Sequence, residues 1–251
     1  MATEADRLER QRVFVTMHAT FKDEEKCRVA METIVSDAHA ADGVHSHFWF
    51  RSDDGRSLFV VEQYADERAL RMAVRRFTSA RVSFFRSIKV DEVAIYGDVS
   101  FVIKMLFAAL RPKYMNYHDG FSKHVTEASE PSIKGFERER VFVATNATFA
   151  ATQSDREAVG RLVTNSYAEP AISSQFWTTS RNGDAVFALE QFVDEKALAN
   201  LLAADPTSSA AFLEAINVGD VTVYGVESEE VKKILTPLEP TYMNYYGGYS
   251  K

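Results

Sequence analysis

The chain has 251 residues, of which 46% are hydrophobic and 26% charged, and its formal net charge is −7. This composition is typical of a globular protein long enough for two domains. The acidic balance disfavours phosphate backbones and anionic lipid surfaces, so we expect neither nucleic-acid nor membrane binding. The single cysteine, Cys27, excludes an intrachain disulfide and a cysteine-rich metal site. Because the charged N-terminus lacks the apolar core of a signal peptide, the sequence predicts a cytoplasmic protein.

The second half of the chain repeats the first at a constant spacing of 128 residues, as from Val13 to Val141. About 39 of roughly 111 aligned pairs are identical, without a gap. A unit of this length that occurs twice indicates duplicated domains. We therefore expect an N-terminal extension, a first domain, a polar linker and a second domain, at residues 1–11, 12–123, 124–138 and 139–251.

Each repeat is predicted to begin with a strand, because Val13–Phe21 and Val141–Phe149 are rich in β-branched and aromatic residues. Apolar residues at helical spacing then predict helices over Asp23–Ala40 and Thr152–Ala168. A hairpin follows, since Asp-Gly and Asn-Gly are strong short signals for a tight turn between strands. The hairpin strands are expected at Val44–Arg51, Leu58–Tyr64, Ile172–Thr179 and Val186–Phe192.

A second helix is predicted after each hairpin, because Asp66 and Asp194 stand where an N-cap is needed ahead of Ala-Leu. These helices are expected to reach Phe77 and Ala204. A shorter helical piece, a last strand and a final helix complete each repeat. They are expected at 84–88, 92–96 and 100–112 in the first repeat and at 210–216, 220–224 and 228–240 in the second.

The resulting order, β-α-β-β-α-β, is the ferredoxin-like pattern. Helices on one face of such a sheet leave its other face bare, and the first strand is apolar on both faces. Burial of one apolar side chain contributes about 1.5–3 kcal/mol, so a bare face is unfavourable. We therefore predict an α+β fold in which two tandem ferredoxin-like βαββαβ domains pack as an intramolecular dimeric α/β barrel.

The segment Glu62–Leu70 contains a Glu, an aromatic residue, an Asp and a final Ala-Leu, and Glu190–Leu198 repeats them. This pattern resembles the antibiotic biosynthesis monooxygenase family of the dimeric α/β-barrel superfamily, over residues 12–97 and 140–225. The resemblance implies oxygenation or rearrangement of an aromatic or polyketide-like compound, with no bound cofactor. A His common after Ala-Leu in active members is missing here. The haem-degrading branch is matched only at Asn146, so haem binding or degradation is a weaker alternative.

His18 and Glu62 are the candidate catalytic residues. Alternation on the first strand places His18 on the face away from the helices, and a neutral imidazole can act as a base near pH 7. A carboxylate such as Glu62 in an apolar barrel would have a raised pKa and could act as an acid or base. A purely structural role stays open for both, because buried polar groups are normally paired and Glu62 recurs as Glu190.

The remaining candidates are substrate-binding residues, on the same strands or at matching places in the two repeats. They are Asn146, Trp49, Trp177, Glu190, His47, Tyr96 and Tyr224. Both tryptophans also suit a plain hydrophobic core. His45 and His47 form a His-x-His pair that could ligate a metal, but the spacing identifies no third ligand, so no metal site is predicted.

The alternative is a non-catalytic interaction or assembly protein with a filled barrel, in which the tails or the apolar final helix dock partners. The tail Tyr-Met-Asn-Tyr-x-x-Gly-x-Ser-Lys closes both repeats and is expected to be extended, as a clasp on the other domain or a lid. The segment 101–110 is more apolar than 229–238, as an interface would leave it, which favours a homo-oligomer through this helix. A basic stretch, either a solvated face or a site for an anionic partner, comprises Arg68, Arg71, Arg75, Arg76 and Arg81.

Overall fold

The computed structural model describes residues 11–76, 78–122, 140–149, 166, 170–180, 182–204 and 216–250. The chain divides into two compact units. Unit 1 consists of residues 1–115 with 245–251, and unit 2 consists of residues 116–244. The expected linker lies outside the described residues, as do nearly all of the helices expected over 152–168 and 210–216.

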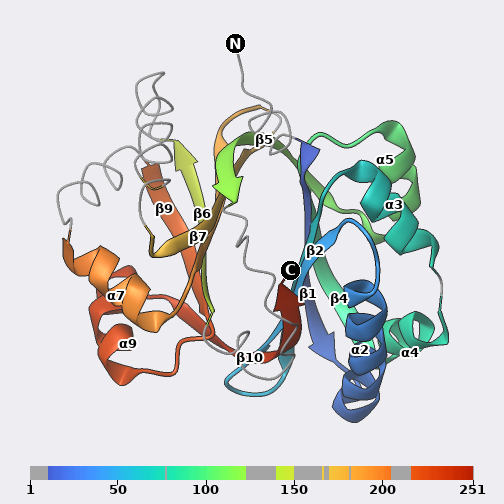
Figure 1. The fold of residues 1–251 in the computed structure, drawn as a ribbon, viewed down its shortest axis with the longest axis horizontal. Helices are drawn as coiled ribbons and strands as arrows, with labels where there is room; N and C mark the ends of the chain where they lie inside the picture. Colours follow the sequence, from blue (N-terminus) through green and yellow to red (C-terminus); the bar gives the residue numbers. More distant parts are fainter. Residues whose placement is uncertain are drawn as a thin grey trace. The chain divides into compact units, whose positions relative to one another are not determined.

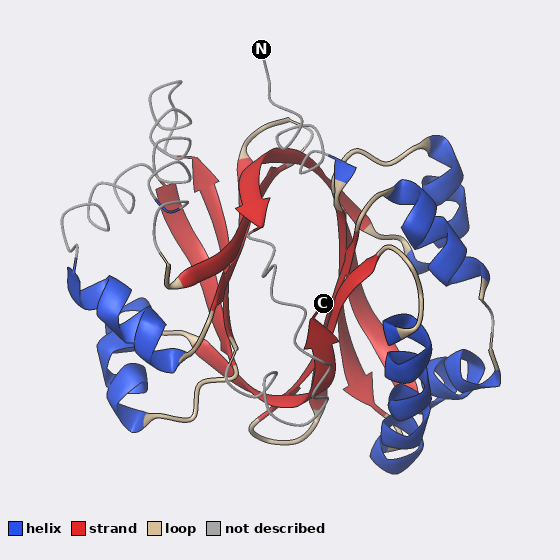
Figure 2. Cartoon of the chain, viewed as in Figure 1, coloured by secondary structure: helices blue, strands red, loops and turns tan. Residues whose placement is uncertain are grey.

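Unit 1 contains an antiparallel sheet in the order β2-β3-β1-β4, with helices on one face (Figures 1 and 2). Its strands are β1 (Val13–Phe21), β2 (Val44–Ser52), β3 (Ser57–Tyr64) and β4 (Ile88–Tyr96). Its helices are α2 (Glu24–His39), α3 (Glu67–Arg75), α4 (Ser79–Ser87) and α5 (Phe101–Phe107), followed by the 3-10 turn η1 (Ala108–Leu110). The element order is the predicted β-α-β-β-α-β, and α4 begins earlier than expected.

Side-chain caps set the starts of these helices. The carboxylate of Asp66 accepts a hydrogen bond from the backbone N–H of Ala69 at 2.7 Å, and Ser100 caps α5 through Val102 N–H at 3.2 Å. The cap at Asp66 was predicted from the sequence. Such a cap satisfies one of the donors that the first helical turn leaves unpaired, which contributes about 1 kcal/mol.

The two faces of the unit 1 sheet differ in what covers them. On the helix side, Val13, Val15, Met17 and Ala19 of β1 pack into one buried cluster with residues of α2 and α4. His18 and its alternate neighbours lie on the opposite face, because successive strand side chains point to opposite sides. The predicted alternation of β1 is therefore confirmed.

Unit 2 has the same topology, with strand order β7-β8-β6-β9 and helices α7 and α9 on one face (Figure 1). Its strands are β6 (Val141–Phe149), β7 (Ile172–Thr179), β8 (Ala185–Phe192) and β9 (Ile216–Tyr224). Its described helices are α7 (Glu195–Ala204) and α9 (Glu229–Leu235), followed by η2 (Thr236–Leu238). The register repeats as well: Val13 lies opposite Tyr64, and Val141 lies opposite Phe192.

The repeated tails form strands β5 (Lys113–Ser122) and β10 (Thr241–Ser250). Each begins in parallel pairing with the last strand of its own repeat, β4 or β9. Residues 116–122 of β5 then pair with β7 of unit 2, and residues 245–251 belong to unit 1, where β10 neighbours β2. Each repeat thus supplies a strand to the other unit. The expected extended conformation and docking on the other repeat are confirmed.

The tail sequence explains this placement. Tyr117 donates a hydrogen bond to the carbonyl oxygen of Gly120 at 3.0 Å, and Tyr245 makes the matching bond to Gly248 at 3.2 Å. Gly248 has a φ of 139°, and a Cβ there would collide with the carbonyl oxygen of His47. The backbone at Gly248 therefore lies so close to the neighbouring strand that only glycine fits, and the hydrogen bond of the recurring Tyr-x-x-Gly holds it there.

Candidate functional site

A buried polar cluster lies on the helix side of unit 1, where β2 and β3 pair. His47 and Glu62 are register partners, and His47 Nε2 lies 2.9 Å from Glu62 Oε1. Tyr64, two residues further along the same face of β3, donates a hydrogen bond from its hydroxyl to Glu62 Oε2 at 2.5 Å. His47 is 1% exposed and Tyr64 is 2% exposed. A carboxylate in such a buried setting needs hydrogen-bonding partners of this kind to be tolerated.

The surroundings set the charge of Glu62. Burial raises the pKa of this carboxyl, but the charge and hydrogen bond of His47, the charge of Arg81 and the hydrogen bond of Tyr64 outweigh it, so the pKa falls to about 2. The raised pKa predicted for Glu62 from the sequence is wrong, because His47 and Arg81, which lower it, come from other elements. Glu62 is therefore an anion near neutral pH, suited to orienting an imidazole and stabilising its protonated form.

Aromatic rings enclose the imidazole of His47. It stacks on Trp49 with ring centroids 4.9 Å apart, and Trp49 meets Phe84 of α4 edge-on at 5.0 Å. Tyr249 of β10 lies 6.4 Å from His47 and 5.0 Å from His39 of α2, measured between ring centroids. The indole N–H of Trp49 is buried and has no hydrogen-bond partner among the described residues. A buried donor of this kind is available to a bound ligand.

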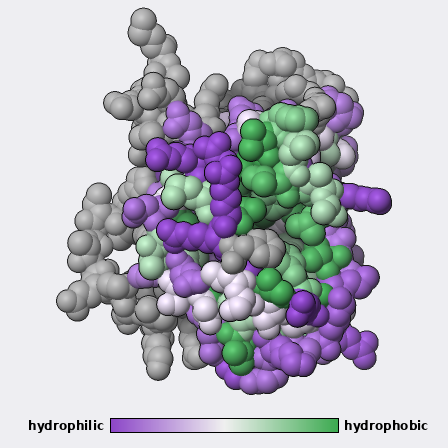
Figure 3. Space-filling view, turned by 90° about the vertical axis from the view of Figure 1, so that its right-hand side faces the viewer, coloured by the Kyte–Doolittle hydropathy of each residue, from purple (hydrophilic) through white to green (hydrophobic). Residues whose placement is uncertain are grey.

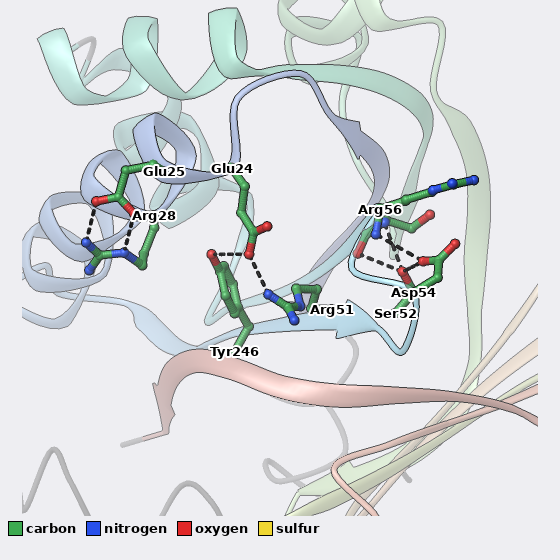
Figure 4. Close-up of polar contacts among 9 residues, drawn as sticks. Glu24, Glu25, Arg28, Arg51, Ser52, Asp54, Arg56 and Tyr246 are labelled. Carbon is green, nitrogen blue, oxygen red and sulfur yellow. Dashed lines mark hydrogen bonds and ion pairs between the residues drawn. The ribbon is translucent and has the colours of Figure 1, made fainter.

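The tail strand is held in unit 1 by polar contacts that Figure 4 shows. The hydroxyl of Tyr246 donates to Glu24 Oε1 at 3.2 Å, and Arg51 Nη1 lies 2.5 Å from the same oxygen. The guanidinium carbon of Arg51 also lies 5.8 Å from the centroid of the Tyr246 ring. These contacts tie β10 to α2 and β2, and they hold the segment that carries Tyr249.

Unit 2 lacks the ionic part of this cluster. Gln175 replaces His47 and Phe192 replaces Tyr64, while Glu190 corresponds to Glu62. The side-chain amide of Gln175 donates a hydrogen bond to Glu190. Burial raises the pKa of Glu190, and this hydrogen bond offsets the rise only in part. The same backbone thus places an amide beside the buried carboxyl in unit 2 and an imidazole beside it in unit 1.

The other predicted residues separate into two groups. Trp49 and Trp177 belong to the helix-side hydrophobic clusters of their units. The residues on the faces away from the helices are His18, Tyr96, Asn146 and Tyr224. His18 is exposed, and its ring centroid lies 4.3 Å from that of Phe59. Since His18 and Glu62 lie on opposite faces of one sheet, they cannot act on the same bound molecule.

Tyr64 and Tyr249 are members of the cluster that the sequence prediction missed. The signal for Tyr64 was its position two residues after Glu62, on the same face of a predicted strand. The signal for Tyr249 was its place in the repeated tail, although no sequence pattern shows which residues a tail will reach. Arg81 was noticed only as part of a basic stretch.

Two surface hollows lie away from this cluster. One, of about 710 Å³, lies between α2 and α4 and is lined by Asp23, Lys26, Ser79, Val82, Ser83, Arg86 and Ser87. The other, of about 480 Å³, lies beside α9 in unit 2. No predicted site residue lines either hollow. Over the described parts of the chain, no group of three or more His, Cys, Asp or Glu residues is arranged to hold a metal, and no helix is long and apolar enough to cross a membrane.

Solved structures share this fold. A Lactobacillus acidophilus NCFM protein described as a putative monooxygenase matches with a TM-score of 0.56 and 12% identity, over 85% of this chain and 91% of its own. A protein from Fusobacterium nucleatum subsp. nucleatum with the same description matches with a TM-score of 0.57 and 13% identity, over 84% and 89%. No family model matches the chain, and no curated protein matches it by sequence. The chain therefore shares the α+β fold of these two structures.

Proposed function

We propose that unit 1 binds a small hydroxylated aromatic compound beside His47 and Trp49 and oxygenates it without a cofactor. The proposal rests on the difference between the two repeats at the positions of His47 and Tyr64. Gln175, Glu190 and Phe192 occupy the same positions in unit 2, so the fold tolerates an amide in place of the imidazole. A buried charged group is seldom worth more to stability than a well-packed neutral substitute, so stability alone does not account for a histidine beside Glu62.

The proposed chemistry starts with proton transfer. His47, in its neutral form, takes the proton of an aromatic hydroxyl as a general base, and the Glu62 carboxylate stabilises the imidazolium that forms. The resulting electron-rich anion reacts with dioxygen at an activated ring methylene. One oxygen atom forms the carbonyl, and the other leaves as water with the two methylene hydrogens, so the atoms balance. His47 returns its proton in the course of this step.

The walls of the cluster suit such a ligand. Trp49 and Tyr249 present aromatic surfaces next to His47, and the buried Trp49 N–H can donate to a ligand oxygen. Ligand sites are commonly apolar with a few placed polar groups. Phe84 of α4 and the β10 tail cover the cluster, so entry of a ligand requires movement of one of these segments. The two matching structures support the fold on which this proposal rests.

The test compares His47→Gln, which installs the residue found in unit 2, with His18→Ala on the opposite face. Purified protein is incubated with anthrones under ¹⁸O₂, and labelled product is measured by mass spectrometry, with ligand-induced melting shifts measured in parallel. We expect His47→Gln to lower the rate by about 100-fold or more and His18→Ala to leave it unchanged. Equal loss in both variants, or a folded His47→Gln variant as active as the wild type, overturns the proposal, as does the absence of both turnover and melting shifts in the wild type.

A further inference from the structure

Helix α3 and its C-cap residue, Arg76, present four arginines around Met72. Arg68, Arg75 and Arg76 are exposed, and Arg71 is partly exposed. None of the four guanidinium groups has a hydrogen bond or ion pair with another residue that the structure describes. The spacings of three, four and seven residues among Arg68, Arg71 and Arg75 place these three on one side of the helix, where like charges destabilise it by a few tenths of a kcal/mol per pair. The helix and its C-cap therefore carry a concentration of positive charge without ion pairs to the described residues.

Helix α5 exposes an apolar stripe. Phe101, Val102, Met105 and Leu106 are 73%, 44%, 63% and 42% exposed. Met72 of α3 is 50% exposed as well. We call these five residues, together with the four arginines of α3, the α3–α5 surface. Figure 3 shows hydrophobic side chains gathered on the helix-bearing side of unit 1, with strongly hydrophilic ones beside them.

A polar link joins the two helices at their N-termini. The Glu67 carboxylate accepts hydrogen bonds from Ser100, at 2.7 Å from the backbone N–H and 2.5 Å from the hydroxyl. Since Glu67 begins α3 and Ser100 caps α5, this link holds the starts of both helices together. The basic and apolar parts of the surface are thus neighbours.

The second repeat lacks both parts. On α7, the residues that correspond to Arg68, Arg71, Met72, Arg75 and Arg76 are Lys196, Ala199, Asn200, Ala203 and Ala204. On α9, the residues that correspond to the exposed stripe of α5 are Glu229, Glu230, Lys233 and Ile234. The same two helices therefore form without the arginines and with charged residues in place of most of the stripe, so the fold does not require the α3–α5 surface.

We propose that the α3–α5 surface binds an amphipathic segment of a partner protein that carries acidic side chains beside apolar ones. Guanidinium groups pair with carboxylates through two parallel hydrogen bonds, and an exposed apolar stripe accommodates the apolar side of a helix. Charge is the ground on which we prefer an acidic segment to other partners of this surface. The chain carries −7 overall, which opposes extended polyanions, and a second copy would bring four arginines against four arginines. The homo-oligomer expected from the sequence stays a prediction and is an outcome of the test.

The probe is a synthetic helical peptide with Glu and Leu at helical spacing, and its control carries Gln in place of every Glu. Binding is followed by fluorescence anisotropy at two salt concentrations. The variants exchange residues between repeats: Arg71→Ala, Arg75→Ala and Arg76→Ala together, and Phe101→Glu with Val102→Glu. We expect the acidic peptide to bind at least about tenfold tighter than its control, and each exchange to remove that preference without changing the melting temperature.

A matched control brings the stripe of α5 into unit 2 through Glu229→Phe and Glu230→Val. This variant gains apolar surface without the arginines, so its affinity for the acidic peptide should equal that of the wild type. Equal affinity for both peptides overturns the proposal, as does unchanged binding in the exchange variants. A dimer in light scattering that Phe101→Glu with Val102→Glu abolishes would assign the surface to a second copy. Tighter binding to phosphatidylserine vesicles than to the peptide would assign it to lipid. Either result also overturns the proposal.

Discussion

His47 Nε2 and Glu62 Oε1 lie 2.9 Å apart on directly opposed residues of β2 and β3, beneath the helices of unit 1. Unit 2 has Gln175 and Glu190 at the matching positions. The two units thus contain the same carboxyl residue beside a titratable partner in one case and a neutral partner in the other. Burial raises the pKa of both carboxyls, but the net shift is downward for Glu62 and upward for Glu190. This contrast leads to two opposite predictions for acid unfolding.

The Glu62→Gln variant should lose stability at neutral pH and become less sensitive to acid. The folded pKa of Glu62 is about 2, below its ordinary value of 4.5. Its carboxylate therefore contributes stability above about pH 4.5, and this contribution disappears as the pH falls toward 2, by at most about 3 kcal/mol. Urea unfolding at a series of pH values should show the wild type and the variant converging at low pH. Parallel curves across this range would contradict the assignment.

The Glu190→Gln variant should behave in the opposite way. Burial raises the pKa of Glu190, so ionisation favours the unfolded chain, and stability is lost as the pH rises through the folded pKa. A neutral glutamine keeps an oxygen that can accept the Gln175 hydrogen bond and removes this loss. The variant should therefore be at least as stable as the wild type near pH 7, with the difference vanishing in acid. A variant less stable than the wild type near pH 7 would show that Glu190 is held as an anion.

Two adjacent glycines in the tail provide a matched pair. A Cβ at Gly248 would collide with the carbonyl oxygen of His47, whereas a Cβ at Gly247 meets nothing within 4 Å. Gly248→Ala should destabilise the protein by about 1–3 kcal/mol, because the residue has a φ of 139° and lies against a neighbouring strand. Gly247→Ala should change the stability little. Chemical unfolding of both variants would check this, and equal effects would mean that the tail does not pack closely on β2.

The sequence allowed the element order and the strand faces to be predicted because each was present twice. Val13–Phe21 and Val141–Phe149 share one alternation, and both repeats place an Asp ahead of Ala-Leu. Local rules of periodicity and capping determine these features, so reading them needs no knowledge of distant contacts.

The make-up of the site could be predicted only in part, because it depends on contacts between distant segments. Alternation along each strand shows which neighbouring residues share a face with His18 or with Glu62. Only the register of β1 against β3 shows that His18 and Glu62 themselves lie on opposite faces of the sheet. The pKa of Glu62 depends on His47 from β2 and on Arg81 from α4. Tyr249 enters the cluster through strand pairing with residues about 200 positions earlier in the chain, which no local pattern encodes.

Because the end of each tail belongs to the other unit, neither repeat by itself contains all the strands of its unit's sheet. A polypeptide that stopped at residue 123 would keep its own tail but lack the strand that residues 245–250 lay beside β2, and its open edge would be free to recruit the tail of an identical molecule. Joining the two repeats on one chain supplies both tails at once, at an effective concentration that separate half-length polypeptides would lack.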